Sequence, residues 1–102
     1  QKTIKVKSPG MKYRHYSPTA KIILFEPQAQ NKLPSYAQHL LDKNYSFKIF
    51  KPRSVTTFSK NMFQLFREAD REGVQYILIR GFSENGLGLA VMNRLRKASS
   101  KV

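Results

Sequence analysis

The chain has 102 residues, none of them cysteine, and only 6 of them are acidic. Without cysteine it cannot form a disulfide, bind a metal through thiolates or use a cysteine nucleophile. No apolar run is long enough to cross a membrane or to form the core of a signal peptide. These absences favour a soluble protein of a reducing compartment, and we expect a cytoplasmic location without membrane contact.

Basic residues dominate the charged positions. The sequence has 19 Lys and Arg against 6 Asp and Glu, which gives a formal net charge of +13. Six basic residues precede the first acid, Glu26, and a second basic group, Arg94, Arg96, Lys97 and Lys101, closes the chain. Such an excess favours contact with nucleic acid, a nucleotide or an acidic surface. It is equally compatible with solubility alone, or with a charge that another part of a longer protein balances.

After the first 19 residues, apolar patterns of strand length and helix length alternate. The uninterrupted apolar run at 22–25 predicts a strand buried on both faces, and residues 74–79 predict a second strand. Between them, apolar side chains alternate with polar ones at Tyr45, Phe47 and Ile49. This alternation predicts a half-buried strand at a sheet edge.

Two helices are expected between these strands. Pro34 suits the first turn of the first helix. Its apolar face would hold Ala37, Leu40 and Leu41. The second helix has a long apolar stripe and ends where Gly73 can adopt a left-handed conformation. The stripe consists of Phe58, Met62, Leu65, Phe66 and Ala69.

A third helix, over residues 86–98, follows the last strand. Its apolar face would hold Leu87, Val91 and Leu95. The β-branched residues at 55–57 favour a further short strand ahead of the second helix.

The order β-α-β-α-β-α predicts a parallel sheet with right-handed crossovers and helices on both faces. We therefore predict an α/β protein with a Rossmann-like three-layer α/β/α domain and a small, mostly parallel sheet. The domain would occupy residues 20–102, preceded by an extended linker over residues 1–19.

One glycine-rich loop has the spacing of a phosphate-binding loop without its chemistry. Gly81 and Gly86 follow a strand and open a helix, but Leu87 and Gly88 stand where Lys and Ser or Thr are required. We therefore interpret the glycines as permitting a tight turn and close helix packing.

The remaining chemistry-bearing residues have ordinary explanations. Arg94, Arg96 and Lys97 can stabilise the carbonyls of a helix end by about 0.3–1 kcal/mol each, or can hold RNA or a partner domain. His39 is expected on a helix surface. Two His, no Cys and scattered acids offer no triad, no acid pair and no metal set. We expect this chain to contain no catalytic residue, no metal site and no cofactor of its own.

The segment SPGMKYRHYSP, residues 8–18, has the most distinctive composition in the chain. It contains no acid, and its Pro-Gly and Ser-Pro pairs interrupt regular structure. Lys12 and Arg14 can bind phosphates, and the aromatic residues around them can contact a base or sugar. This composition predicts a loop over an anionic ligand. The alternative is a tether whose tyrosines pack on the domain while its charges face water.

Three segments resemble long-form threonylcarbamoyl-AMP synthases. Residues 8–18 resemble that family's interdomain linker, and residues 86–98, GLGLAVMNRLRKA, resemble its closing helix. Residues 65–74 resemble the helix-to-strand step before its last strand. The resemblance implies that a YrdC-like catalytic domain would precede Gln1, so this chain is expected to be a C-terminal fragment. The brief connection between residues 50 and 58 indicates a smaller sheet than is usual there.

The resemblance also implies an activity for the longer parent protein. That enzyme condenses threonine, bicarbonate and ATP, with Mg, to threonylcarbamoyl-AMP and pyrophosphate, on the route to threonylcarbamoyladenosine in tRNA. In related enzymes the linker is thought to cover the adenylate as a lid. The residues at lid positions here are Lys12, Tyr13, Arg14, His15 and Tyr16. Lys12 and Arg14 would offer charge to phosphates, and the other three would supply hydrogen bonds and ring contacts.

Two further functions remain open at this point. The net charge and the mixture of basic and aromatic residues at 12–16 suit a module that binds single-stranded RNA, although no recognised RNA-binding signature is present. Alternatively, the domain binds other proteins of the same tRNA-modification pathway. The implied partners are therefore the catalytic domain of the same chain, tRNA, or other tRNA-modification proteins.

Overall fold

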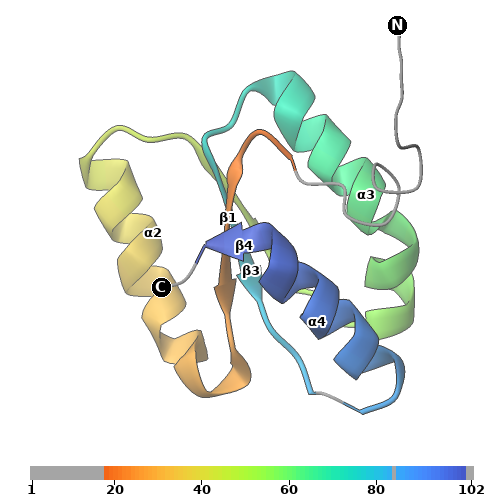
Figure 1. Ribbon diagram of the computed structural model, residues 1–102. Coiled ribbons are helices and arrows are strands. Elements are labelled where there is room, and N and C mark those ends of the chain that lie inside the picture. The colour runs from red at the N-terminus through yellow and green to blue at the C-terminus, as the bar shows by residue number, and fades with distance from the viewer. Residues whose placement is uncertain (1–17, 84, 101–102) are drawn as a thin grey trace, which may run out of the picture.

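The computed structural model describes residues 18–83 and 85–100. Strands and helices alternate along these residues, as predicted (Figure 1). The elements in chain order are β1 (Lys21–Phe25), the 3-10 turn η1 (Pro27–Lys32), α2 (Leu33–Asp42), β2 (Phe47–Phe50), α3 (Val55–Glu72), β3 (Tyr76–Arg80), α4 (Leu87–Ala98) and β4 (Ser99–Ser100). Within the two described ranges, no helix is both long and apolar enough to span a membrane.

The four strands form one parallel sheet in the order β2-β3-β1-β4. The central strands β1 and β3 pair from Lys21 opposite Tyr76 to Phe25 opposite Arg80. The β1 side chains from Ile22 to Phe25 are buried, which confirms the strand predicted from the uninterrupted apolar run. The edge position predicted for β2 is also confirmed. The two-residue strand β4 is too short for any apolar periodicity to indicate it.

Helices cover both faces of the sheet. In Figure 1, α2 lies on one side of the sheet, and α3 and α4 lie on the other. Ile22 and Leu24 of β1 belong to the apolar core under α3 and α4, whereas Ile23 and Phe25 belong to the core under α2. The connection from β1 to β2 moves across the sheet in one direction, and the two later connections move in the other. Because such crossovers are right-handed, the helix of the first connection has to lie on the opposite face from the helices of the other two. The predicted three-layer α/β/α architecture is confirmed.

The longest helix, α3, has a distinct signal at each end. Ser54 caps its start, because its Oγ accepts the backbone N–H of Thr57 at 3.2 Å. Gly73 follows its last turn with a left-handed φ of 76°, as predicted. The short strand predicted at residues 55–57 is wrong, since these residues form the first turn of α3. The serine cap prevails there over the β-branched preference of Val55 and its two neighbours.

In two helices, the predicted apolar face includes one residue that is exposed in the structure. Leu41 is 57% exposed, and α2 buries instead Leu33, Ala37 and Leu40. Leu41 lies at the margin of that face, one residue before α2 ends. Leu87 is 46% exposed because it is the first residue of α4, one turn ahead of the buried Val91.

The edge strand is shorter than its sequence pattern indicates. Tyr45 was expected in this strand, but β2 begins only at Phe47. Asn44 has a left-handed φ of 65°, and the turn that it makes leaves Tyr45 outside the sheet. Ile49 is exposed and Phe47 is half-buried, so the strand contributes less apolar surface than the alternation predicts.

Candidate functional site

The five predicted lid residues lie outside the part of the chain that the structure describes: Lys12, Tyr13, Arg14, His15 and Tyr16. The described residues do show how the chain enters the domain. Thr19 and Ala20 donate their backbone N–H groups to Oδ1 of Asp70, with N–O distances of 2.8 and 3.3 Å. Ala20 is buried against the core under α3 and α4. The entry point is therefore fixed at the end of the sheet where the parallel strands begin, which we call the amino edge.

At the opposite edge, where the strands end, side chains tie the loops together. We call this the carboxyl edge. Gly81, after β3, donates its N–H to the carbonyl of Phe25 at 2.7 Å, and its own carbonyl accepts Nε2 of Gln30 at 2.9 Å. Glu26 accepts two bonds from the guanidinium of Arg96, with Nε–Oε2 at 2.8 Å and Nη2–Oε1 at 2.7 Å. The end of β1 is thereby joined both to β3 and to α4.

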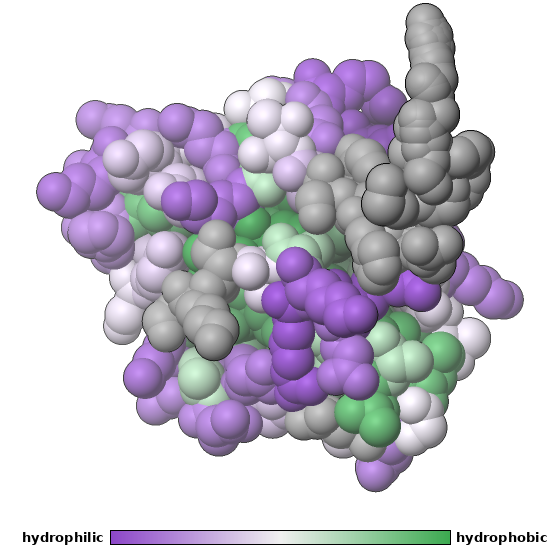
Figure 2. All heavy atoms as spheres, in the orientation of Figure 1, coloured by the Kyte–Doolittle hydropathy of each residue, from purple (hydrophilic) through white to green (hydrophobic). Residues whose placement is uncertain are grey.

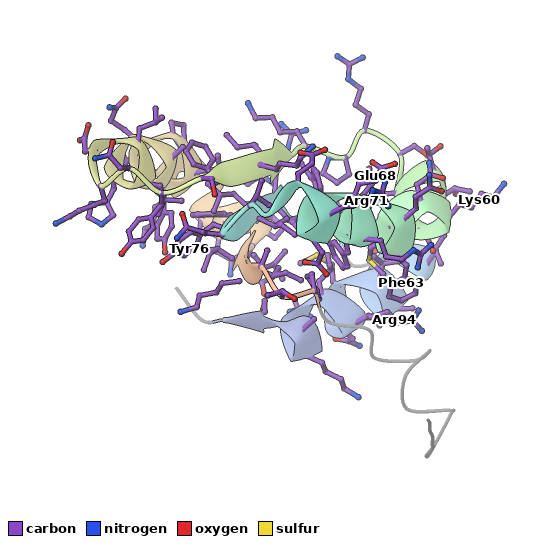
Figure 3. The ribbon with its side chains drawn as sticks, turned by 90° about the horizontal axis from the view of Figure 1, so that it is seen from above. Lys60, Phe63, Glu68, Arg71, Tyr76 and Arg94 are labelled. Atoms are coloured by element: carbon purple, nitrogen blue, oxygen red, sulfur yellow. The ribbon has the colours of Figure 1, made fainter. Side chains whose placement is uncertain are left out.

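These contacts account for part of the basic group at the end of α4. Arg96 forms the pair with Glu26, and Arg94 lies over the ring of Phe63 on α3, 5.6 Å from its centroid (Figure 3). A cation over an aromatic face is attractive because of the ring quadrupole. Lys97 is exposed. Two of the three cations whose role the sequence left open thus have contacts within the domain.

The glycines between residues 81 and 88 serve close packing and a turn. A Cβ atom on Gly81 would lie 2.8 Å from the carbonyl oxygen of Phe25. A Cβ atom on Gly88, in the first turn of α4, would overlap the carbonyl oxygen of Ser83. The close packing is confirmed at Gly81, and Gly86, with a positive φ of 53° and open space where a Cβ would lie, serves the turn rather than the packing.

Titratable groups in the described residues show no catalytic arrangement. Burial raises the pKa of Tyr36 above its ordinary value, and the nearby Tyr76 adds to the rise. Tyr36 packs edge-on against Phe25, so its environment belongs to the core under α2. His39 is exposed on α2, as predicted. No group of three or more His, Asp or Glu in residues 18–83 and 85–100 could hold a metal ion.

An apolar patch and several hollows lie at the surface of the described residues. Hydrophobic residues reach the surface around the first turns of α4, where Leu87 and Leu89 are exposed (Figure 2). A few exposed hydrophobic residues are common on folded domains and do not identify a partner. One hollow, of about 290 Å³, lies beside the start of α3 and is lined mostly by apolar atoms of residues between Pro52 and Leu65.

Another hollow, of about 240 Å³, lies at the carboxyl edge on the α2 side. Its lining includes Gln30, Asn31, Lys51 and Arg80. Sequence reasoning did not single out Lys51 or Arg80, because they are far apart in the chain. Only the pairing of β2 with β3 brings them together, so the sole signal was that each follows or ends a predicted strand.

Comparison with known proteins identifies a family. The family model described as "Threonylcarbamoyl-AMP synthase, C-terminal domain" matches residues 1–100. The threonylcarbamoyl-AMP synthase of Pyrococcus abyssi is 38% identical over 108 residues, which cover 91% of this chain and 32% of that protein. The Schizosaccharomyces pombe protein is 36% identical over 121 residues, which cover 93% of this chain and 30% of that protein. The chain thus spans about a third of the length of these relatives.

Solved structures agree. The structure of P. abyssi Sua5 complexed with L-threonine superposes with a TM-score of 0.75 at 37% identity, covering 95% of this chain and 34% of that one. A variant of the same protein, with a consecutive His and Tyr replaced by alanine, gives a TM-score of 0.73 at 35% identity and covers 95% and 33%. Both likenesses extend beyond the fold alone to the sequence.

Proposed function

Because this chain belongs to the family of threonylcarbamoyl-AMP synthase C-terminal domains, we propose that it is the accessory domain of an enzyme that makes threonylcarbamoyl-AMP. That enzyme, the parent protein, condenses threonine, bicarbonate and ATP, with Mg, and releases pyrophosphate, on the route to modified tRNA. Its YrdC-like catalytic domain precedes this chain. The observation that carries the proposal is the family match over residues 1–100, which includes the linker as well as the domain.

In this proposal the linker covers the active site as a lid. Lys12 and Arg14 neutralise phosphate oxygens of the nucleotide, because ammonium and guanidinium groups form strong charge-assisted hydrogen bonds with phosphate. Tyr13, His15 and Tyr16 supply further hydrogen bonds and ring contacts. The catalytic residues themselves belong to the preceding domain, and this chain contributes to the enclosure.

The His-Tyr pair supports this placement. Only His15 and His39 are present in this sequence, and only His15 is followed by tyrosine. A variant of the P. abyssi protein that lacks a consecutive His and Tyr has been solved. We propose that His15-Tyr16 corresponds to that pair.

The anchored entry of the chain also supports a lid. Asp70 holds the backbone at Thr19 and Ala20, at the amino edge. Tyr16 precedes Thr19 by three residues, and an extended chain spans about 3.3–3.6 Å per residue. Chain length alone therefore keeps Tyr16, the last residue of the motif, within about 11 Å of this anchor.

A lid has a physical purpose in this reaction. Threonylcarbamoyl-AMP is a mixed anhydride of a carbamate and a phosphate, and water hydrolyses such anhydrides. A loop that closes over the site excludes water and limits that loss. Lys12 and Arg14 would close it by their attraction to the phosphate.

The test is threonine- and bicarbonate-dependent pyrophosphate release by the parent protein. We compare it with a variant in which Lys12, Tyr13, Arg14 and His15 are changed to alanine. The expected result is at least a tenfold loss of turnover in a protein that remains folded.

A matched control distinguishes the motif from the general charge of the linker. Changing Lys5 and Lys7 to alanine removes the same number of positive charges from the linker outside the motif. This control is expected to retain activity within twofold. Equal activity of the motif variant and the wild-type protein would reject the lid, and the linker would then be a tether.

A second candidate function follows from the charge of +13: the chain binds RNA. Release of counterions makes such binding fall steeply with salt. Titration of the chain with single-stranded RNA and with tRNA at two salt concentrations tests this candidate. Submicromolar binding that is lost at high salt supports it, and the absence of binding at low salt rejects it.

A further inference from the structure

Lys51 and Arg80 lie side by side in the hollow at the carboxyl edge. β2 pairs with β3 so that Phe50 lies opposite Ile79. Lys51 and Arg80 are the next residues along the two chains, so they are neighbours. Both line the same hollow of about 240 Å³. Like charges on directly neighbouring strand positions repel each other. The fold thus holds two positive charges close together in a concave site.

No carboxylate in the described residues neutralises this pair. The lining of the hollow contains Gln30 and Asn31 but neither Asp nor Glu. Glu26 follows β1 at the same edge of the sheet, and both of its oxygens accept bonds from Arg96. The two amides and the two cations therefore give the hollow hydrogen-bond donors and positive charge.

The hollow also lies where the direction of the connections changes. The connection after β1 crosses the α2 face towards β2, and the connection after β3 crosses the other face towards β4. In open parallel sheets, ligands bind outside the carboxyl ends of the strands at such a reversal. Gln30 spans it, because it follows β1 and bonds to the carbonyl of Gly81 after β3.

From these observations we propose that the hollow binds the phosphate or diphosphate group of a small molecule. Lys51 and Arg80 hold the charge, and Asn31 adds an amide donor. A volume of about 240 Å³ is below the range of about 300–1,000 Å³ usual for whole drug-sized ligands. The hollow therefore fits the phosphate group itself, while the rest of the molecule lies outside.

The proposal is independent of the lid, because it concerns the opposite edge of the sheet. It is tested on the chain itself by isothermal titration with pyrophosphate, inorganic phosphate and AMP, with ionic strength held constant by chloride. We expect saturable binding of pyrophosphate with one site per chain. Amide chemical shifts are expected to move at Gly81 and at the Gln30 side chain, which lie at the hollow.

Three double variants make the test specific: one removes both positive charges from the hollow, one keeps them there, and a control removes two positive charges elsewhere. Lys51→Gln with Arg80→Gln is expected to weaken pyrophosphate binding at least tenfold, and Lys51→Arg with Arg80→Lys to retain most of it. The control is Lys60→Gln with Arg71→Gln on α3, both exposed and away from the hollow (Figure 3). The control is expected to change the affinity less than twofold. Thermal unfolding establishes that each variant is folded.

Three results would overturn the proposal. The first is the absence of saturable binding by any of the three anions. The second is an equal loss of affinity in the hollow variant and the α3 control, which would show that net charge alone attracts the anion. The third is displacement of pyrophosphate by a short RNA at lower concentration than by AMP, which would assign the hollow to nucleic acid.

Discussion

At the amino edge of the sheet, the carboxylate of Asp70 holds the backbone of the entering chain at Thr19 and Ala20. At the carboxyl edge, side chains tie the loops after β1 and β3 together, and a hollow with Lys51 and Arg80 stays open beside them. Negative charge at one edge therefore positions the protein's own backbone. Positive charge at the other edge faces a space that a ligand can enter.

The hollow at the carboxyl edge reflects a general property of the fold, whereas the linker at the amino edge is particular to the family. Parallel α/β sheets bind ligands outside the carboxyl ends of their strands. The linker motif that resembles the synthase lid is attached instead at the amino edge. The two regions are thus expected to respond independently to substitution, unless the common core is damaged.

The largest effect is expected in the core that lies between the two edges. Helix α3 runs from the carboxyl edge to the amino edge, and its Phe66 is 1% exposed. Phe66→Ala is expected to lower the free energy of unfolding by about 3–5 kcal/mol, because it leaves a cavity in the core. Urea unfolding measures this loss. The half-buried neighbour Phe63 is the control, with a smaller loss for Phe63→Ala, and the reverse order would contradict the deeper burial of Phe66.

The next largest effect concerns the carboxyl edge alone. Gly88→Ala places a methyl group against the carbonyl oxygen of Ser83, and backbone has to move to admit it. We expect a loss of about 1–3 kcal/mol, as for other overpacked positions. Leu89→Ala, at an exposed position on the same helix, is expected to change stability by about 0.5 kcal/mol or less. Similar effects of the two substitutions would show that the loop relaxes freely.

At the amino edge, Asp70→Ala removes the acceptor of two backbone N–H groups. We expect a loss of about 1–2 kcal/mol, together with faster hydrogen exchange at Thr19 and Ala20. Asp70→Asn keeps the Oδ1 acceptor and is expected to retain most of the protection. Unchanged exchange in the alanine variant would mean that Asp70 does not anchor the chain.

The smallest effect is expected at the hollow. Arg80→Gln removes one of two neighbouring positive charges, so stability is expected to stay the same or rise by up to about 0.5 kcal/mol in the absence of ligand. Thermal unfolding at low ionic strength measures the change. A loss of more than about 1 kcal/mol would show that Arg80 stabilises the fold, and the contrast between the two edges would then be weaker.

Much of the fold could be predicted from the sequence, because its central strands and longest helix have strong local signals. The uninterrupted run at 22–25 indicated a buried strand, and Gly73 indicated the end of α3. The short strand at 55–57 was predicted wrongly because Ser54 favours a helix start. Leu41 was placed on the buried face because spacing alone does not show where a helix leaves the sheet.

The contacts at both edges could not be predicted in the same way. Asp70 is some fifty positions from Thr19 in the sequence, and Lys51 meets Arg80 only through the pairing of β2 with β3. Such contacts arise from the order of strands in the sheet, which the local pattern does not specify. The predicted lid residues around Arg14 lie outside the described residues, so their role stays a prediction.

The lid is tested most directly by the fate of the adenylate in the parent protein. The measurement is the ratio of AMP to threonylcarbamoyl-AMP released per pyrophosphate, with and without Lys12, Tyr13, Arg14 and His15. We expect that changing these four residues to alanine raises the ratio several-fold, because water reaches the mixed anhydride. An unchanged ratio would reject the lid and leave the linker as a connection between two domains.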